Sequence, residues 1–286
     1  MKVNYFDGKK IAFEKERELK KDVARLRRKG VTPKLASIVV GDVGAGKFYQ
    51  SLKKKAAERI GAEIKIISLS PSISLKEIKA EIEKYNSDPK VHGVMIQLPL
   101  PGNLRLKTKN LIQSIDARKD VDGLREDSQF LTPVVKAVLA ALIEATYVLS
   151  SGSNRLNVGL KTVVVGAKGF EGTKITRVLQ EMGYEVIGAD VETKDLKLRP
   201  KDDQPLAEKT KNADIVISVT GSPGLIEPDM IKDGAAVIDV GAPIGDINKK
   251  IYKKAAFVSP VPGGIGPVTI SMLLENLVEA AKGIEI

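Results

Sequence analysis

The stretch Thr162-Val-Val-Val-Gly-Ala-Lys-Gly-Phe-Glu-Gly172 joins an apolar run directly to a glycine-rich turn. The residues that follow predict a helix over 173–182 and a second strand over 185–189, which ends at Asp190. A strand, a glycine-rich turn, a helix, a second strand and a terminal acid describe the first half of a dinucleotide-binding fold. The glycines allow a tight turn, and the amides at the helix N-terminus can bind a pyrophosphate.

The spacing of this turn is by itself a weak indication, because Gly166-Ala-Lys-Gly-Phe-Glu-Gly172 departs from G-x-G-x-x-G. Asp190 strengthens the interpretation, since an acid at the end of the second strand can accept hydrogen bonds from the adenosine ribose. That role favours NAD and repels the 2′-phosphate of NADP. Lys168 and Lys194 indicate the opposite, because either could pair with a 2′-phosphate. Asp190 could also be an ordinary turn residue.

Outside this stretch, strands and helices alternate along most of the chain, which predicts an α/β fold with parallel strands and helices on both faces. Further strands are expected over 35–40, 63–69, 94–97, 215–219, 236–240 and 255–258. Helices are expected over 12–29, 47–60, 134–148 and 268–282, and the capping box Ser74-Leu-Lys-Glu77 announces another. The most linker-like segment, 150–154, comes just before the pattern restarts, so two domains are expected.

The composition excludes several classes of protein. The 286 residues include no cysteine and a single histidine, His92, which argues against disulfides, thiolate metal sites and a Ser/His/Asp triad. The N-terminus lacks the apolar core of a signal peptide, and no apolar run approaches the roughly 20 residues of a membrane span, so a cytoplasmic protein is expected. The net charge of +10 comes with only 4% aromatic residues, which favours anionic small molecules over nucleic acid.

A second motif, Gly41-Asp-Val-Gly-Ala-Gly-Lys-Phe-Tyr-Gln-Ser-Leu-Lys53, follows an apolar strand and opens a helix. It fits a phosphate-binding loop only in part, because Phe48 stands where magnesium requires Ser or Thr. Tyr49 and Lys53 match the Tyr-x-x-x-Lys pair of short-chain dehydrogenases. In those enzymes the glycine-rich turn precedes the pair, whereas here it follows the pair. The pair can instead act on one ligand from one helix face. An ordinary helix surface is the alternative, because two more lysines follow Lys53.

Four further segments favour the ligand-binding interpretation. They are His92-Gly-Val-Met-Ile-Gln-Leu-Pro-Leu-Pro101, Lys119-Asp-Val-Asp-Gly123, Ala236-Val-Ile-Asp-Val-Gly241 and Val258-Ser-Pro-Val-Pro-Gly-Gly-Ile-Gly-Pro-Val-Thr269. With them, the chain resembles the bifunctional methylenetetrahydrofolate dehydrogenase/cyclohydrolase family over nearly its full length. The last segment is the most specific, since so dense a proline-glycine loop between a strand and a helix rarely recurs by chance.

The resemblance implies a role for each matching residue. Lys53 would be the general acid/base, with Gln97 hydrogen-bonded to its amine and Asp122 completing the catalytic set at the amino edge of the pterin. Tyr49 would pack against the pterin–aminobenzoyl region. The other implied substrate-binding residues are Leu98, Pro262, Gly263 and Gly264. The implied cofactor-binding residues are Gly166, Ala167, Lys168, Gly172, Asp190, Val191 and Ala242. A lysine titrates near pH 10.4, so its environment must make proton exchange near neutrality possible.

The resemblance also implies the reaction and the architecture. The protein would oxidise 5,10-methylenetetrahydrofolate to the methenyl compound with NAD(P)⁺ and hydrolyse that compound to 10-formyltetrahydrofolate. NADP is the cofactor by resemblance, NAD is possible because of Asp190, and no metal is required. The expected architecture is a catalytic domain over 1–124, joined by the C-terminal helix 268–286, and a Rossmann-like domain over 125–267, with the active-site cleft between them. A homodimer is expected.

Two other functions stay open at this stage. One is a methylenetetrahydromethanopterin dehydrogenase without cyclohydrolase activity, which would share the fold and the hydride transfer. The other is a nucleotide-binding module without catalysis. Tyr49, Lys53, Gln97 and Asp122 together argue against the second.

Overall fold

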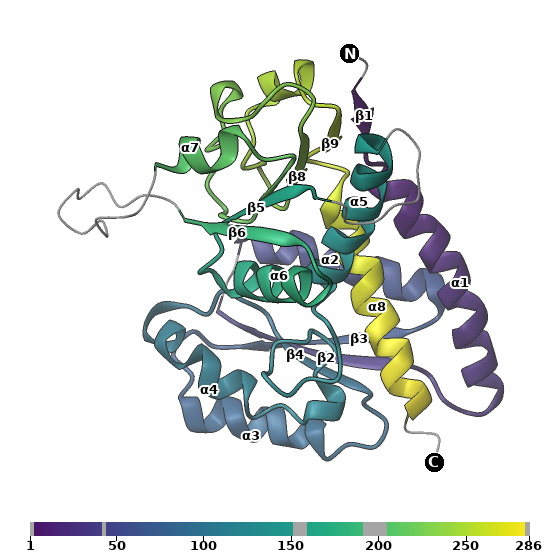
Figure 1. The fold of residues 1–286 in the computed structure, drawn as a ribbon. Helices are drawn as coiled ribbons and strands as arrows, with labels where there is room; N and C mark the ends of the chain where they lie inside the picture. The colour runs from purple at the N-terminus through teal and green to yellow at the C-terminus, as the bar shows by residue number, and fades with distance from the viewer. Residues whose placement is uncertain (1–2, 42–43, 151–158, 191–204, 284–286) are drawn as a thin grey trace. The chain divides into compact units, whose positions relative to one another are not determined.

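The computed structural model describes residues 3–41, 44–150, 159–190 and 205–283 (Figure 1). The chain forms two compact units. Unit 1 comprises Met1–Lys10 and Val134–Thr269, and unit 2 comprises Ile11–Pro133 and Ile270–Ile286. None of the helices in these described ranges combines the length and apolar character that crossing a bilayer requires.

Unit 1 is built on a parallel sheet that has six strands within the described residues, in the order β1-β9-β8-β7-β5-β6. The strands are β1 (Asn4–Tyr5), β5 (Lys161–Val165), β6 (Glu185–Ala189), β7 (Ile215–Ser218), β8 (Ala236–Asp239) and β9 (Phe257–Ser259). Every side chain of β7, β8 and β9 is buried. Such continuous burial is typical of a parallel sheet covered on both faces, and it explains why these strands are apolar except for their last residues, Ser218, Asp239 and Ser259.

Helices and short 3₁₀ turns connect these strands. They are α5 (Pro133–Leu149), α6 (Phe170–Glu181), α7 (Leu206–Lys211), η4 (Pro228–Met230) and η5 (Lys249–Lys253). The helix α6 lies along β5 and β6 (Figure 1). It presents Ile175, Val178 and Leu179 to the interior at helical spacing.

Unit 2 is built on a smaller parallel sheet in the order β3-β2-β4. Its strands are β2 (Lys34–Val40), β3 (Glu63–Leu69) and β4 (Gly93–Ile96). Its helices and 3₁₀ turns are α1 (Gly8–Arg28), α2 (Gly44–Ile60), α3 (Leu75–Asn86), η1 (Gly102–Lys107), α4 (Thr108–Ile112), η2 (Ala117–Lys119) and α8 (Ile265–Gly283). The first residues of α1 and of α8 belong to unit 1.

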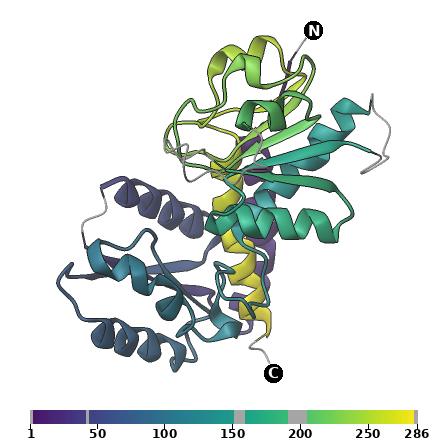
Figure 2. The ribbon, with the colours of Figure 1, turned by 60° about the vertical axis from the view of Figure 1, so that its left-hand side comes forward.

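The two faces of this small sheet are covered by different helices. Leu35 belongs to a core cluster with residues of α1, α2 and α8, whereas Ala36, Ile38 and Val40 belong to a second cluster with α3 and residues around α4. This separation follows from the two-residue period of a strand, which points successive side chains to opposite faces. In both views the strands lie between α2 and α3 (Figure 2).

The predicted fold class, a two-domain α/β protein with parallel strands, is confirmed. The strand over 63–69 was predicted to the residue, and the capping box of Ser74 and Glu77 begins α3 as expected. Of the linker-like segment 150–154, residues 151–154 lie outside the described residues.

Several boundaries differ from the predictions; the helices expected from 47 and 268, for example, begin at Gly44 and Ile265. The helix expected over 12–29 begins at Gly8, where a Cβ would lie 1.8 Å from the Gly264 carbonyl oxygen. The helix expected to begin at Thr173 begins at Phe170, so the turn is shorter than predicted. β1 was not predicted, and it places residues 1–10 in unit 1, whereas they were expected in the domain over 1–124. The early start of α1 and the pairing of β1 involve residues that are far apart in the sequence, whereas α6 begins within the turn itself, with Gly169 as its N-cap.

Candidate functional site

A lysine and a neutral amide meet in unit 2. Lys53 lies on α2, and Gln97 directly follows β4. Lys53 Nζ donates a hydrogen bond to Gln97 Oε1 over 3.2 Å and lies 3.9 Å from Met95 Sδ. The backbone amide of Gln97 donates to the Ile38 carbonyl over 2.8 Å, which extends the pairing of β4 with β2 by one residue. The sheet therefore fixes the position from which Gln97 reaches the lysine.

Burial changes the proton affinity of both predicted residues on α2. It lowers the pKa of Lys53 below its ordinary value, and the negative charge of Asp122 opposes part of that change. Burial raises the pKa of Tyr49, one helical turn before Lys53, so the phenol stays neutral at physiological pH. Lys53 is thus an amine that can exchange a proton more readily than a surface lysine.

The segment that carries Asp122 is held by the C-terminal helix. Val121 is fully buried, and Asn276 on α8 donates its side-chain amide to the carbonyls of Val121 over 2.8 Å and Leu131 over 3.0 Å. Asn276 is itself fully buried. The segment that places Asp122 near Lys53 is therefore held by Asn276, which lies 155 positions after Val121 in the chain.

Two other polar residues of the segment 119–123 have structural roles. Lys119 is 6% exposed and donates to three backbone carbonyls at the end of α3, those of Tyr85 (3.0 Å), Asn86 (2.7 Å) and Asp88 (2.8 Å). Asp120 is fully buried and accepts hydrogen bonds from the amides of Leu124 and Arg125. In this motif only Asp122 acts on Lys53.

The glycine-rich turn of unit 1 has the backbone geometry that a nucleotide turn requires. Gly166 has a φ of +88°, and a Cβ there would lie 2.8 Å from the Val219 carbonyl oxygen. A Cβ at Gly172 would lie 2.0 Å from the Gly166 carbonyl oxygen, so this glycine allows α6 to pack directly against the turn. Gly169 is the N-cap of α6, and no side chain caps that helix end.

Asp190 contacts the turn directly. Its Oδ1 accepts a hydrogen bond from the Lys168 amide over 2.9 Å, and its Oδ2 lies 3.7 Å from Lys168 Nζ. The two residues that indicated opposite cofactors are therefore neighbours. Ala167 lies between Gly166 and Lys168 in the sequence, and its amide donates to the Ala189 carbonyl over 3.2 Å. Val191 and Lys194 lie outside the described residues.

The remaining predicted residues occupy loops with cis peptide bonds. Leu98 precedes Pro99 through a cis bond in unit 2, and its carbonyl accepts a hydrogen bond from Gln97 Nε2 over 2.9 Å. In unit 1, cis bonds join Ala242 to Pro243 and Val261 to Pro262. Gly263 has a φ of +108°, and the amide of Gly264 donates to the Pro260 carbonyl over 2.7 Å. A glycine is required at position 263 because other residues rarely adopt this conformation.

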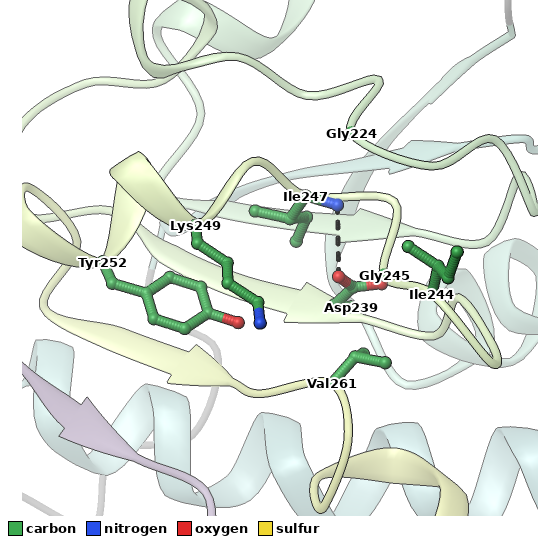
Figure 3. A pocket seen from close by; sticks show the side chains of 8 residues that line it. All are labelled: Gly224, Asp239, Ile244, Gly245, Ile247, Lys249, Tyr252 and Val261. Atoms are coloured by element: carbon green, nitrogen blue, oxygen red, sulfur yellow. Dashed lines mark hydrogen bonds between the residues drawn. The ribbon is translucent and has the colours of Figure 1, made fainter.

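A cavity of about 160 Å³ lies in unit 1, lined by Gly224, Asp239, Ile244, Gly245, Ile247, Lys249, Tyr252 and Val261 (Figure 3). The predicted site residues are not among them. Asp239 is 1% exposed and accepts hydrogen bonds from the amides of Gly241, Asp246 and Ile247. Burial nevertheless raises the pKa of Asp239 to about 6. These contacts organise the loop between β8 and η5, which contains Ala242.

Two buried residues beside Gln97 were not predicted. Gln50 donates from Nε2 to Gln97 Oε1 over 2.8 Å, and Ser37 donates from Oγ to Gln50 Oε1 over 3.2 Å. Ser37 was visible in the sequence as a polar residue inside an apolar strand, and Gln50 lies one residue after Tyr49. Neither signal indicated that the two side chains meet.

The fold and the two sets of residues define a two-unit α/β protein of the dinucleotide-binding class. Residues 6–122 match the tetrahydrofolate dehydrogenase/cyclohydrolase catalytic domain, and residues 144–285 match the NAD(P)-binding domain of the same enzymes. The chain belongs to the tetrahydrofolate dehydrogenase/cyclohydrolase family.

Known relatives resemble the chain over its whole length. The bifunctional protein FolD of Nautilia profundicola is 36% identical over an alignment of 292 positions that covers 96% of this chain and 96% of that protein. The crystal structure of FolD from Campylobacter jejuni superposes with a TM-score of 0.84 at 32% identity and covers 98% of this chain and 99% of that one. FolD of Trypanosoma brucei, solved with NADP cofactor and an inhibitor, gives a TM-score of 0.84 at 28% identity and covers 99% of this chain and 98% of that one.

Proposed function

We propose that this protein oxidises 5,10-methylenetetrahydrofolate to 5,10-methenyltetrahydrofolate with a nicotinamide dinucleotide and hydrolyses the product to 10-formyltetrahydrofolate. The observation that carries the proposal is the hydrogen bond between Lys53 and Gln97, within a chain whose full-length relatives are bifunctional FolD proteins. A neutral amide can orient a lysine amine without fixing its charge as a carboxylate would. That arrangement suits a group that must exchange protons during a reaction.

Lys53 is proposed to transfer protons in the hydrolytic step. Its lowered pKa leaves a larger fraction of neutral amine near neutrality than an exposed lysine would have. The neutral amine can take a proton from the water that adds to the methenyl carbon, and the resulting ammonium can donate a proton as the ring opens. Gln97 holds the amine, Asp122 binds the amino edge of the pterin, and Tyr49 packs against the ring system. Leu98, Pro262, Gly263 and Gly264 are proposed to complete the substrate site.

The glycine-rich turn of unit 1 is proposed to hold the cofactor. Gly166, Ala167, Lys168 and Gly172 would approach its pyrophosphate, because the glycines leave the backbone uncovered and no side chain caps α6. Ala242 and Val191 are further proposed contacts. When bound, the nicotinamide ring accepts the hydride. The protein's own contribution is to hold the two reactants in the geometry of reaction.

The choice between NAD and NADP is proposed to depend on Asp190. The NADP complex of the Trypanosoma brucei relative supports NADP, while the Asp190 carboxylate at the end of β6 supports NAD. Lys168 Nζ lies close enough to Asp190 to offset part of its charge. A homodimer in the cytoplasm is the assembly and location that the family resemblance favours.

The test of this function measures both reactions. Purified protein with methylenetetrahydrofolate and NAD or NADP is expected to produce reduced nicotinamide, followed by absorbance changes, and to hydrolyse added methenyltetrahydrofolate. Lys53→Met removes the proton-transferring amine and should lower the rate of hydrolysis by about 100-fold or more. Lys54→Met, at the exposed neighbouring position on the same helix, should keep the unaltered rate.

Three results would count against the proposal. Absence of turnover with both cofactors would contradict the dehydrogenase assignment, and faster turnover of methylenetetrahydromethanopterin would change the carrier. Stabilisation by the cofactor without any turnover would favour a binding module. If the Lys53→Met variant hydrolysed methenyltetrahydrofolate as fast as the Lys54→Met variant, the proposed role of Lys53 would be refuted, but the proposed function of the protein would not.

A further inference from the structure

Unit 2 contains a chain of hydrogen-bonded polar side chains that ends at Lys53. Ser37 on β2 is fully buried, and Gln50 on α2 is 4% exposed. Ser37 bonds to Gln50, Gln50 bonds to Gln97, and Gln97 accepts from Lys53, over 3.2, 2.8 and 3.2 Å. Ser37 pairs in register with Met95 of β4 and lies on the same sheet face as Leu35, which packs in the core cluster of α2. Polar groups in such a place require hydrogen-bond partners.

The backbone fixes the direction of every hydrogen bond in this chain. The Leu98 carbonyl can only accept, so the Gln97 group that faces it must be the amide nitrogen. Gln97 Oε1 therefore faces both Lys53 and Gln50. Gln50 must then present its nitrogen to Gln97 and its oxygen to Ser37, which must donate. A flipped Gln97 would place its oxygen against the Leu98 carbonyl and its nitrogen against two donors.

We propose that Gln50, held by Ser37, is a positioning residue that, together with the Leu98 carbonyl, holds the Gln97 amide with its oxygen toward Lys53 and competes with the lysine for that oxygen. The proposal rests on the proposed function of Lys53. It adds two residues that touch neither reactant in the proposed mechanism and act through Gln97. Gln50 and Lys53 are one helical turn apart on α2, so the helix holds both donors against one acceptor.

The competition has a predictable direction. Two N–H groups share Gln97 Oε1, so each bond is weaker than it would be alone, and the partial positive charge of the Gln50 amide lies beside the Lys53 ammonium. Both effects disfavour the charged lysine. Among the described residues packed around Lys53, the charged group acting on it is Asp122, which favours the ammonium, and the titratable Tyr49 stays neutral. Removing Gln50 should therefore raise the pKa of Lys53.

The main test uses the double variant Ser37→Ala/Gln50→Met, which removes both polar groups and leaves no donor or acceptor without a partner at either position. Replacing both members of a buried hydrogen bond with apolar groups of similar shape is close to neutral for stability. The pH profile of methenyltetrahydrofolate hydrolysis should move upward by about half a pH unit to one unit. KM should change little, because the Gln50 side chain is almost fully buried.

A second variant and a control separate positioning from packing. Gln50→Glu replaces the donor with an acceptor and adds a negative charge, so it should shift the profile upward further than the double variant. Ser37→Ala alone leaves the Gln50 donor in place, so its profile should shift less than that of the double variant. A profile of the double variant that coincides with that of the unaltered protein, or moves downward, overturns the proposal.

A direct titration distinguishes failure of this inference from failure of the proposed function. Lysine ¹³Cε NMR, with the Lys53 signal assigned by its loss in Lys53→Met, reports the protonation of Lys53 without any turnover. An inactive protein in which Ser37→Ala/Gln50→Met raises the Lys53 pKa would refute the function and leave the positioning intact. An active protein with an unchanged Lys53 titration would refute the positioning.

Discussion

Single residues in this chain acquire their chemistry from the groups that surround them. Lys53, Lys119 and Lys168 are all lysines near predicted motifs, yet they differ in role. Lys53 contacts an amide oxygen, Lys119 binds three backbone carbonyls, and Lys168 is exposed beside Asp190. The residue type alone would assign all three to anion binding. The partners observed in the structure separate them.

The prediction at this scale concerns Asp190. Asp190→Ser removes the carboxylate that would repel a 2′-phosphate and frees Lys168 Nζ to pair with one, so the ratio of kcat/KM for NADP to that for NAD should rise about tenfold or more. The ratio is measured by steady-state kinetics with each cofactor. Glu185→Ser, at the opposite and exposed end of β6, serves as the control. A strong preference for NADP in the unaltered protein would show that Asp190 does not favour NAD.

At the scale of elements, α3 is stabilised at both ends by different means. Its N-terminus has the capping box, in which Glu77 and Ser74 satisfy each other's backbone amides. Its C-terminus is completed by Lys119, which bonds to the carbonyls of Tyr85 and Asn86 in the last turn and to that of Asp88 just beyond the helix. The first device is local and was predicted from four residues. The second joins positions more than thirty residues apart and was not.

The prediction for this element is that Lys119→Met destabilises unit 2. Methionine keeps the apolar stem but leaves the carbonyls of Tyr85 and Asn86 without this donor, while the Asp88 carbonyl keeps its bond from the Val91 amide. We expect a cost of about 2 kcal/mol in the free energy of unfolding. Urea unfolding followed by circular dichroism measures the change. Lys90→Met, at an exposed lysine close to the end of α3, should change the free energy by less than about 0.5 kcal/mol. Equal stability of the two variants would show that the three bonds contribute nothing net.

At the scale of the whole molecule, neither unit is a continuous piece of chain. The chain passes between units after residues 10, 133 and 269. Residues 1–10 supply β1 to the larger sheet, and α8 supplies Leu273, Leu274, Leu277 and Val278 to the core cluster of unit 2. Family models that end the catalytic domain at residue 122 therefore omit part of the core of this unit.

The corresponding prediction is that a chain ending at Thr269 cannot fold unit 2. It would lose four almost fully buried apolar side chains, each contributing about 1.5 to 3 kcal/mol, together with the Asn276 bonds that hold the segment before Asp122. That sum is comparable with the total stability of a typical domain. Hydrogen exchange should show loss of protection in β2, whereas a chain ending at Gly283 should keep it. Protection of β2 in both chains would contradict this dependence on α8.

Much of this architecture could be predicted because its determinants are local. Apolar runs of four to seven residues mark the buried parallel strands, the glycines at 166 and 172 mark a turn with no room for a Cβ, and Ser74 marks a helix start. Lys53 and Gln97 were paired by resemblance to a family, and the structure places them in contact. β1 and the early start of α1 escaped prediction because their partners, β9 and Gly264, lie about 250 residues away.

The sequence by itself determined the order of strands and helices, the class of fold and the family, since periodicity, turns and motifs are written in short stretches of chain. Only the tertiary structure decided which polar residues surround Lys53. It brought Ser37, Gln50 and Gln97 together from a strand, a helix and a strand end, and it assigned Lys119 and Asp120 to structural hydrogen bonds. The reason is physical: the hydrogen bonding and charge of a buried side chain depend on neighbours that the fold supplies.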